Sequence, residues 1–387
     1  MNKQVGNVQL MQKINRLKVL DCIRRNPGIV RPAVAEQTGL SLSSITNIVS
    51  FLIEKGLVSE TGFENADRIG RKAVLLKFCP SAYYLICVTL SAHRIITALT
   101  DLDGRRLEVS ESVFSDQTAD EALRQIQRDI TVLLARCEAQ RVLAIGIAVS
   151  ALVLPDGSVA VSTRLHWDRP DLKTELSQKF QKPVFITNTS VARAHYCNQN
   201  TCGGHMHSML FIDLMDGVGA VHFYDGHCNR SVLGEIGHTT VEKDGDACFC
   251  GNHGCLEIMC SMERVVAQYR AAGKGEDLTD VKNGSLVGEP VAVRLLQRAG
   301  EYLGIGIANA VNVLNPDMVV LNAGQYLQCP QVLDKAIETA RLRTFSALAA
   351  HVTFETTDIS DAMMTEGMAQ SLCECIFALD FHGDIFA

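Results

Sequence analysis

The residues best suited to chemistry are three cysteines crowded into one short loop. Residues 238–257 read HTTVEKDGDACFCGNHGCLE, and they hold Cys248, Cys250 and Cys255 within eight positions. The glycines between these cysteines permit the sharp reversals that such a loop needs. Three thiolates and one imidazole form a common tetrahedral donor set for zinc, and bound zinc keeps thiolates deprotonated at neutral pH. The spacing therefore predicts a zinc site.

Two histidines are candidates for the fourth ligand. His253 lies inside the loop, two residues from Cys255, whereas His238 lies ten residues before Cys248. A site with four protein ligands has no open position for water, so the predicted zinc is structural and not catalytic.

Length and composition place these residues in a globular protein of more than one domain. The chain has 387 residues, of which 47% are hydrophobic and 20% charged, which is typical of two or three domains with their own cores. No apolar run approaches the ~18 residues of a membrane span, and the first residues lack the apolar core of a secretory signal. We therefore expect a cytoplasmic protein without membrane insertion, whose 14 cysteines are reduced thiols or metal ligands.

The charge is divided unevenly along the chain. Residues 1–78 contain 12 basic and 6 acidic side chains, whereas the remainder contains 24 and 37. A basic head on an acidic body indicates that the head is the part that meets a polyanion.

The basic head has the pattern of a winged helix-turn-helix. Residues 12–25 show apolar positions at helical spacing, residues 31–39 form a second short helix, and a third helix begins after Ser41 as its cap. The stretches GLVSETG and GRKAVLLKF then predict two short strands around a polar loop, which is the wing. The alternative is a helical domain with a solvated basic face.

The third helix and the wing supply the candidate DNA contacts. Small polar groups near the start of a recognition helix can reach base edges, and basic groups of a wing can reach phosphates or the minor groove. The expected base-contacting residues are Ser43, Ser44, Thr46 and Asn47, and the expected wing contacts are Arg68, Arg71 and Lys72.

From about residue 80 the sequence changes to alternating strand and helix signals, which predict an α/β body. Helical patterns cover 119–137 and 290–314. The apolar or β-branched runs that we interpret as strands are 84–90, 95–101, 143–149, 184–187, 209–213 and 318–322.

The body resembles the ROK family (repressor, open reading frame, kinase), whose members are sugar kinases or sugar-responsive repressors. The resemblance is most specific at LGEIGHTTVEKDGDACFCGNHGCLE (233–257) and covers most of residues 80–370. The helix-turn-helix in front resembles the repressor branch, which includes the glucose, N-acetylglucosamine and xylose repressors. Further matching stretches are DLDG (101–104), TRLHW (163–167), PVFITN (183–188), DGVGAVHFYDG (216–226) and NAVNVLNPDMVVLNAG (309–324).

The resemblance implies a two-lobed actin-like ATPase fold of the sugar kinase and hexokinase type behind the winged helix-turn-helix domain. We expect this DNA-binding domain at 1–79, a first α/β lobe at 80–187 plus about 363–387, and a second α/β lobe at 188–362 that carries the zinc loop.

Two departures from the family pattern argue against kinase activity. The family's phosphate-binding Asp-x-Gly-Gly-Thr-Lys motif corresponds here to residues 89–94, which read TLSAHR and lack the aspartate and both glycines. The family's catalytic aspartate follows an asparagine, but here Thr189 follows Asn188. A threonine hydroxyl cannot act as the general base, and such a loss alone costs about 10²–10⁴-fold in rate. We therefore expect no ATP site and no enzyme.

The resemblance also implies a sugar site and favours His238 as the fourth zinc ligand. With one ring nitrogen on zinc, the other nitrogen of His238 is free to meet a sugar hydroxyl. Carboxylate, amide and imidazole groups suit a polyol, because each can bond neighbouring hydroxyls. The alternative is a buried polar network that no longer binds sugar. The implied sugar-binding residues are Asn188, Thr189, Glu235, His238 and Glu257.

The sequence therefore favours a sugar-responsive DNA-binding regulator. The resemblance implies that this regulator is a repressor. We expect its partners to be operator DNA, a sugar effector and further copies of the chain, as a dimer or tetramer. The alternatives are a ROK sugar kinase with a DNA-binding head, and a regulator controlled by docking to a protein such as a sugar transporter.

Overall fold

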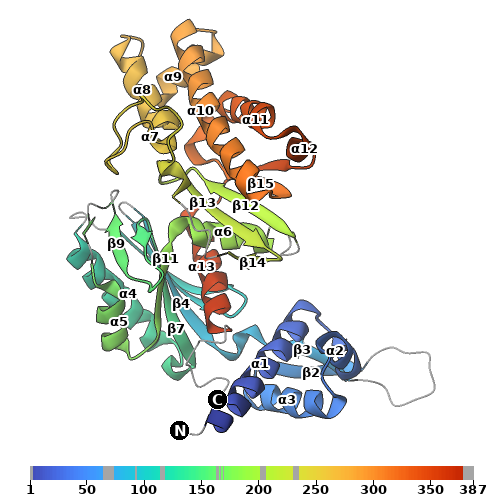
Figure 1. Ribbon diagram of the computed structural model, residues 1–387. Helices are drawn as coiled ribbons and strands as arrows, with labels where there is room; N and C mark the ends of the chain where they lie inside the picture. Colours follow the sequence, from blue (N-terminus) through green and yellow to red (C-terminus); the bar gives the residue numbers. More distant parts are fainter. Residues whose placement is uncertain are drawn as a thin grey trace.

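A computed structural model of the chain shows a small helical head and a two-lobed body (Figure 1). It describes residues 3–63, 74–91, 94–113, 118–162, 165, 167–168, 170–200, 206–229 and 235–377, with side chains from residue 9 onward. No helix in these ranges is long and apolar enough to cross a membrane.

The head contains three helices, as the sequence predicts. They are α1 (Lys3–Arg25), α2 (Arg31–Thr38) and α3 (Leu42–Glu54). Gly39 ends α2 with a φ of 70°, a left-handed conformation that glycine adopts without strain. The side chain of Ser41 caps α3 by accepting a hydrogen bond from the backbone N–H of Ser44. Gly39 and Ser41 therefore determine the tight turn between α2 and α3.

A three-stranded sheet completes the head in the order β1-β3-β2. The antiparallel pair of β2 and β3 matches the two strands that the sequence predicts around the wing. The strands are β1 (Ile29–Val30), β2 (Val58–Phe63) and β3 (Val74–Phe78).

The first lobe is built on a five-stranded sheet in the order β11-β7-β4-β5-β6. Successive residues of β4 point to opposite faces. Ile86 and Val88 therefore pack against α4, while Leu85 and Cys87 pack against α13 (Asp361–Ile376). A small sheet of β8, β9 and β10 lies beside α5. The elements are β4 (Tyr84–Ser91), β5 (Arg94–Asp101), β6 (Arg106–Val113), α4 (Ala119–Arg136), β7 (Val142–Val149), β8 (Leu152–Val153), β9 (Val159–Ser162), β10 (Trp167–Asp168), α5 (Leu172–Phe180) and β11 (Val184–Asn188), with 3₁₀ turns η1 (Pro80–Ala82) and η2 (Ala139–Arg141).

The second lobe repeats this plan on a sheet in the order β14-β13-β12-β15-β16. On β12, Met209 and Phe211 pack against α6, while Leu210 and Ile212 face the outer helices. The strands are β12 (Ser208–Asp213), β13 (Gly219–Tyr224), β14 (His227–Cys228), β15 (Met318–Asn322) and β16 (Thr353–Thr357). The helices are η4 (Ile236–His238), α7 (Leu256–Cys260), α8 (Met262–Ala271), α9 (Leu278–Leu286), α10 (Pro290–Leu314), η5 (Gly324–Gln328), α11 (Gln331–Arg343) and α12 (Ser346–Ala349).

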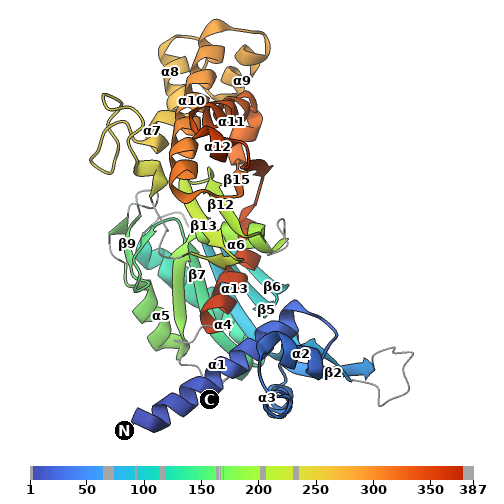
Figure 2. The same cartoon turned by 45° about the vertical axis from the view of Figure 1, so that its right-hand side comes forward.

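Two helices, α6 (Thr189–Asn200) and α13 (Asp361–Ile376), lie between the two sheets (Figure 2). They pack closely, because a side chain at Gly367 of α13 would collide with the backbone of Ala192 in α6. One face of this pair meets the sheet of the first lobe and the other meets the sheet of the second. The helix pair is thus the mechanical connection between the lobes.

The head is packed onto the body and is not a freely attached module. One continuous cluster of buried side chains includes Leu17 and Leu20 of α1, Leu85 of β4 and Leu372 of α13. At the same interface, the guanidinium of Arg24 lies 5.8 Å from the ring centre of Phe377. The structure confirms the predicted α/β class with a winged helix-turn-helix at the N-terminus.

Candidate metal loop and sugar site

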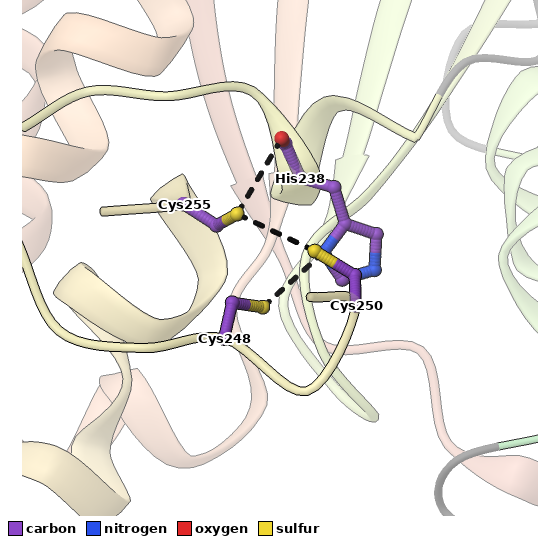
Figure 3. Close-up of side chains that lie close together, drawn as sticks. All are labelled: His238, Cys248, Cys250 and Cys255. Atoms are coloured by element: carbon purple, nitrogen blue, oxygen red, sulfur yellow. Dashed lines mark hydrogen bonds between the residues drawn. The ribbon is translucent and has the colours of Figure 1, made fainter. Parts of the chain in front are cut away.

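The loop before α7 brings four predicted ligands together. The side-chain donor atoms of His238, Cys248, Cys250 and Cys255 all lie within 4.8 Å of one another. His238 comes from η4, and the cysteines come from the loop that follows (Figure 3). Of the two histidines that the sequence leaves open, the structure places His238, and not His253, in this cluster.

The distances within the cluster fit a tetrahedral metal. The Sγ atoms of Cys250 and Cys255 are 3.6 Å apart, and Sγ of Cys248 is also 3.6 Å from Nδ1 of His238. A zinc ion with bond lengths of about 2.3 Å to sulfur and about 2.0 Å to nitrogen would place such pairs about 3.6–3.8 Å apart. The other ring nitrogen of His238 lies on the side away from the thiols (Figure 3). These four side chains therefore form a possible metal site.

Without a cation, the loop would hold its buried thiol in the neutral form. Burial raises the pKa of Cys255 to about 12, and it also raises the pKa of Cys248. Cys250 is exposed, and a backbone hydrogen bond from Asn252 lowers its pKa. A donor set of two buried thiols, one exposed thiol and one imidazole therefore gains charge stabilisation from a bound cation.

An aromatic contact fixes the imidazole. The ring of Phe249 meets the ring of His238 edge to face, with 5.0 Å between the ring centres. Phe249 itself is 56% exposed, so this contact lies near the protein surface.

The structure links the segments that carry the predicted sugar-binding residues. Asn188 is the last residue of β11, and its side chain donates to the backbone oxygen of Ala151 and accepts from the N–H of Ser190. Ser190 in turn lies against Gly219, at the start of β13. The amide of Asn188 is therefore fixed in orientation, and it keeps one N–H to offer to a ligand.

Glu257 ties the same region to the metal loop. Its Oε2 accepts from the backbone N–H of Val218 at 3.0 Å, and the backbone oxygen of Val218 accepts from Gly237, next to His238. Gly217 has a φ of 150°, and a side chain there would meet the Glu257 carboxylate at 2.6 Å. Glu257 therefore holds the turn before β13 as well as being a candidate for a sugar hydroxyl.

The remaining two predicted sugar residues differ in exposure. Glu235 is exposed at the start of η4. Thr189 is only 2% exposed, at the first position of α6. A hydroxyl at that buried position has no acid–base function at neutral pH.

The β4–β5 hairpin has no glycine-rich turn. The two strands stay paired up to Ser91 and Arg94, and residues 89–94, where the resemblance places the phosphate motif, contain no glycine. Ser91 donates instead to Asp361 at the start of α13.

A cavity of about 490 Å³ is lined by the turn at residues 214–218. It shares Glu257 with the predicted sugar set, but Asn188, Thr189, Glu235 and His238 do not line it. Its walls include Met215, Phe249 and Tyr326.

Sequence reasoning missed Arg193, which the structure buries beside three carboxylates at the junction of the lobes. A signal was present, because Arg193 is the one charged residue in the apolar run Val191–Ala194.

The predicted DNA-contacting residues on α3 lie near its start. Ser43, Thr46 and Asn47 are exposed, whereas the hydroxyl of Ser44 lies 2.8 Å from that of Ser41. Thr46 donates to the backbone oxygen of Leu42. The wing residues Arg68, Arg71 and Lys72 lie outside the described residues.

Comparison with known sequences finds two families in the chain. Residues 85–371 match the ROK family, and residues 13–59 match the winged helix-turn-helix DNA-binding family. The xylose repressor of Bacillus subtilis is 28% identical over 351 residues, covering 89% of this chain and 91% of the repressor. The N-acetylglucosamine repressor of Escherichia coli O157:H7 is 26% identical over 356 residues, covering 87% and 86%.

Solved structures show the same fold. A ROK family transcriptional regulator, described as a homologue of the E. coli MLC protein, superposes with a TM-score of 0.82 at 24% identity, covering 95% of this chain and 97% of that one. A ROK family glucokinase from Streptomyces griseus, in complex with glucose and AMPPNP, superposes with a TM-score of 0.61 at 21% identity, covering 74% and 98%. Because the ROK match spans more than half of its length, this chain belongs to the ROK family.

Proposed function

We propose that the chain is a sugar-responsive transcription regulator that represses genes by binding operator DNA and does not phosphorylate its sugar. The observation that carries the proposal is the buried core that joins the winged helix to the ROK body. In that body the buried Thr189 stands where the family has its catalytic aspartate. The named repressors among its relatives, which match along both parts of the chain, support the same role.

The proposed effector is a sugar bound by Asn188, Thr189, Glu235, His238 and Glu257. The contact of Ser190 with Gly219, which follows Val218, supports a shared site. Hydrogen bonds fix the amide of Asn188 and the carboxylate of Glu257 on either side of this contact. The amide of Asn188 and the carboxylate of Glu257 can both hydrogen-bond sugar hydroxyls, and the charge of the carboxylate strengthens its bond.

The proposed metal is a structural zinc ion held by His238, Cys248, Cys250 and Cys255. Zinc would supply the charge that keeps the buried thiols deprotonated. Its role for the sugar is positional: with Nδ1 of His238 committed to the metal, the opposite ring nitrogen is presented in one tautomer.

Repression through a helix-turn-helix implies at least two heads on a palindromic operator, so the proposed active form is a homodimer or tetramer. A sugar that binds one arrangement of the lobes more tightly than another would shift the heads and change operator affinity. We propose a protein partner as an alternative effector, since a docked partner could also shift the equilibrium between the arrangements of the lobes.

The proposal is tested by a thermal-shift screen across hexoses, pentoses, amino sugars and their phosphates, followed by operator binding with and without each hit. A specific effector raises the melting temperature by mass action and changes operator affinity. The variant Glu235→Gln should weaken the effector response, whereas Glu276→Gln, a matched change at an exposed site, should not. If no sugar shifts the melting temperature or the operator affinity, the sensor function is wrong; sugar-dependent ADP release from ATP would show a kinase instead.

A further inference from the structure

Arg193 lies at the junction of the lobes and contacts three carboxylates. Its Nη1 is 3.0 Å from Asp213, and its Nη2 is 3.1 Å from Asp216 and 3.0 Å from Asp361. The side chain is 1% exposed, which for an arginine requires full compensation of its charge.

These contacts join the two helices between the sheets to the sheet of the second lobe. Arg193 comes from α6, Asp213 ends β12 and Asp361 begins α13. The second oxygen of Asp361 accepts from the hydroxyl of Ser91, at the end of β4 in the first lobe. On the other side, Asp213 accepts from the amide of Asn322, at the end of β15. An unbroken chain of polar contacts therefore runs from the central strand of one lobe to the central strands of the other.

The donor set around Arg193 is one that a hard divalent cation would use. Three carboxylates converge on a single guanidinium, and Asp216 and Asp361 are bound to the same nitrogen. Carboxylate oxygens are preferred ligands of Mg²⁺ and Ca²⁺. Here the central position is filled by a covalently attached cation, which no dissociation can remove.

The cavity beside this cluster has the opposite polarity from a phosphate site. It shares Asp216, and the other carboxylate residues in its described lining are Glu257 and Glu263. Among the described residues no lysine or arginine lines it, so this part of the lining repels an anion.

We infer that Arg193 is a resident cation that takes the place of a metal ion among Asp213, Asp216 and Asp361, and that it holds the two lobes together without metal or nucleotide. The inference rests on the proposed function and adds to it. We use the word hinge for the helix pair α6 and α13 that connects the lobes. A sensor that carries out no kinase reaction still needs this hinge to be held in place. The inference concerns the hinge alone and requires neither a sugar nor DNA to be tested.

The charge of Arg193 is permanent in this setting. Burial lowers the pKa of the guanidinium, but the three carboxylates, with Asp213 foremost, raise the pKa more, so it ends above its ordinary value. Loss of the guanidinium would leave three partly or fully buried carboxylates in mutual repulsion. They could be relieved by protonation, by opening of the hinge, or by capture of a cation from solution.

The test is the melting temperature of the full-length protein in millimolar MgCl₂, compared with NaCl of equal ionic strength. Arg193→Ala removes the charge and leaves room for a hydrated ion. We expect this variant to melt well below the wild type in NaCl and to regain about 5 °C or more in MgCl₂. A variant that is unfolded in NaCl and folds in MgCl₂ would give the same support.

Two controls separate a resident cation from an ordinary buried ion pair. Arg193→Lys keeps the charge, so its melting temperature should not depend on Mg²⁺. Arg106→Ala frees the single carboxylate of Glu366, which is too few ligands to retain the ion. The inference is overturned if Arg193→Ala does not respond to Mg²⁺, whether folded or unfolded, or if the wild type responds as strongly as the variant. Failure of these experiments would leave a sugar response or operator binding untouched, and the reverse also holds.

Discussion

His227 of the second lobe lies between Glu374 of α13 and Arg25 of the head. Its Nδ1 is 3.5 Å from Oε1 of Glu374, and its Nε2 is 3.3 Å from Nη2 of Arg25. The other oxygen of Glu374 is 3.4 Å from Nε2 of His195 in α6. The C-terminal end of α13 therefore meets both its partner helix and the DNA-binding head, while its N-terminal end meets Arg193.

The contact between His227 and Glu374 should weaken as the pH rises. The hydrogen bond to Glu374 raises the pKa of His227 above its usual 6.5, and nearby Asp21 adds to this, although burial and Arg25 lower it. A raised folded-state pKa gives stability that is complete below about pH 6.5 and is lost as the pH rises through the folded pKa. We expect His227→Gln to lower the melting temperature by about 1–2 °C near pH 6 and by less near pH 8.5. The effect is small because the side chain of His227 is 61% exposed.

The matched control for this effect is His351→Gln, which changes an exposed histidine between α12 and β16. The melting temperatures of both variants and of the wild type are compared at the two pH values. An equal loss at both pH values for His227→Gln would contradict the assigned direction of the pKa.

The zinc content and the stability of the protein should depend on Cys255. We expect purified protein to carry about one zinc ion per chain, and Cys255→Ser to lose it, because the substitution removes a buried ligand. The melting temperature should then fall by about 5 °C or more. Zinc content by elemental analysis and the melting curve are the two measurements. Cys79→Ser, at a half-buried cysteine outside the cluster, should keep both values; full zinc content in Cys255→Ser would show that the metal is held elsewhere.

The sequence could predict those parts of the fold that are governed by local periodicity. The caps at Gly39 and Ser41, the long helix α10 and the apolar run of β4 are all visible as patterns in a short window. The metal loop was equally accessible, because its three thiols are close in sequence. The choice of His238 over His253 depended on family resemblance, since spacing alone leaves both open.

The contacts that join distant segments could not be read in the same way. Arg193 and Asp361 are separated by 168 positions, and only the crossing of α6 and α13 makes them neighbours. Likewise, the bond between Glu257 and Val218 depends on how η4 and α7 fold back beside β13. No periodic pattern reports such pairings, because they depend on the relative placement of whole elements.

Restoring the missing carboxylate should not restore a kinase. We expect Thr189→Asp to show no sugar-dependent ADP release, because residues 89–94 still lack the phosphate-binding aspartate and glycines. The new charge enters a site that is 2% exposed, so the melting temperature should fall by several degrees. Thr189→Asn, similar in size but neutral, separates the cost of charge from that of packing. Sugar-dependent turnover by Thr189→Asp in a coupled ADP assay would show that one substitution separates sensor from enzyme.

Operator recognition should depend on the exposed start of α3. An asparagine can make two hydrogen bonds to adenine, and such a pair contributes about 1–3 kcal/mol of discrimination. We therefore expect Asn47→Ala to weaken specific operator binding by about 10-fold or more, with little change in binding to unrelated DNA, as measured by fluorescence anisotropy at fixed salt. Glu54→Gln, at the opposite end of the same helix, is the control for general effects on α3. An equal loss on operator and unrelated DNA would assign Asn47 to backbone contact and place base recognition on other residues.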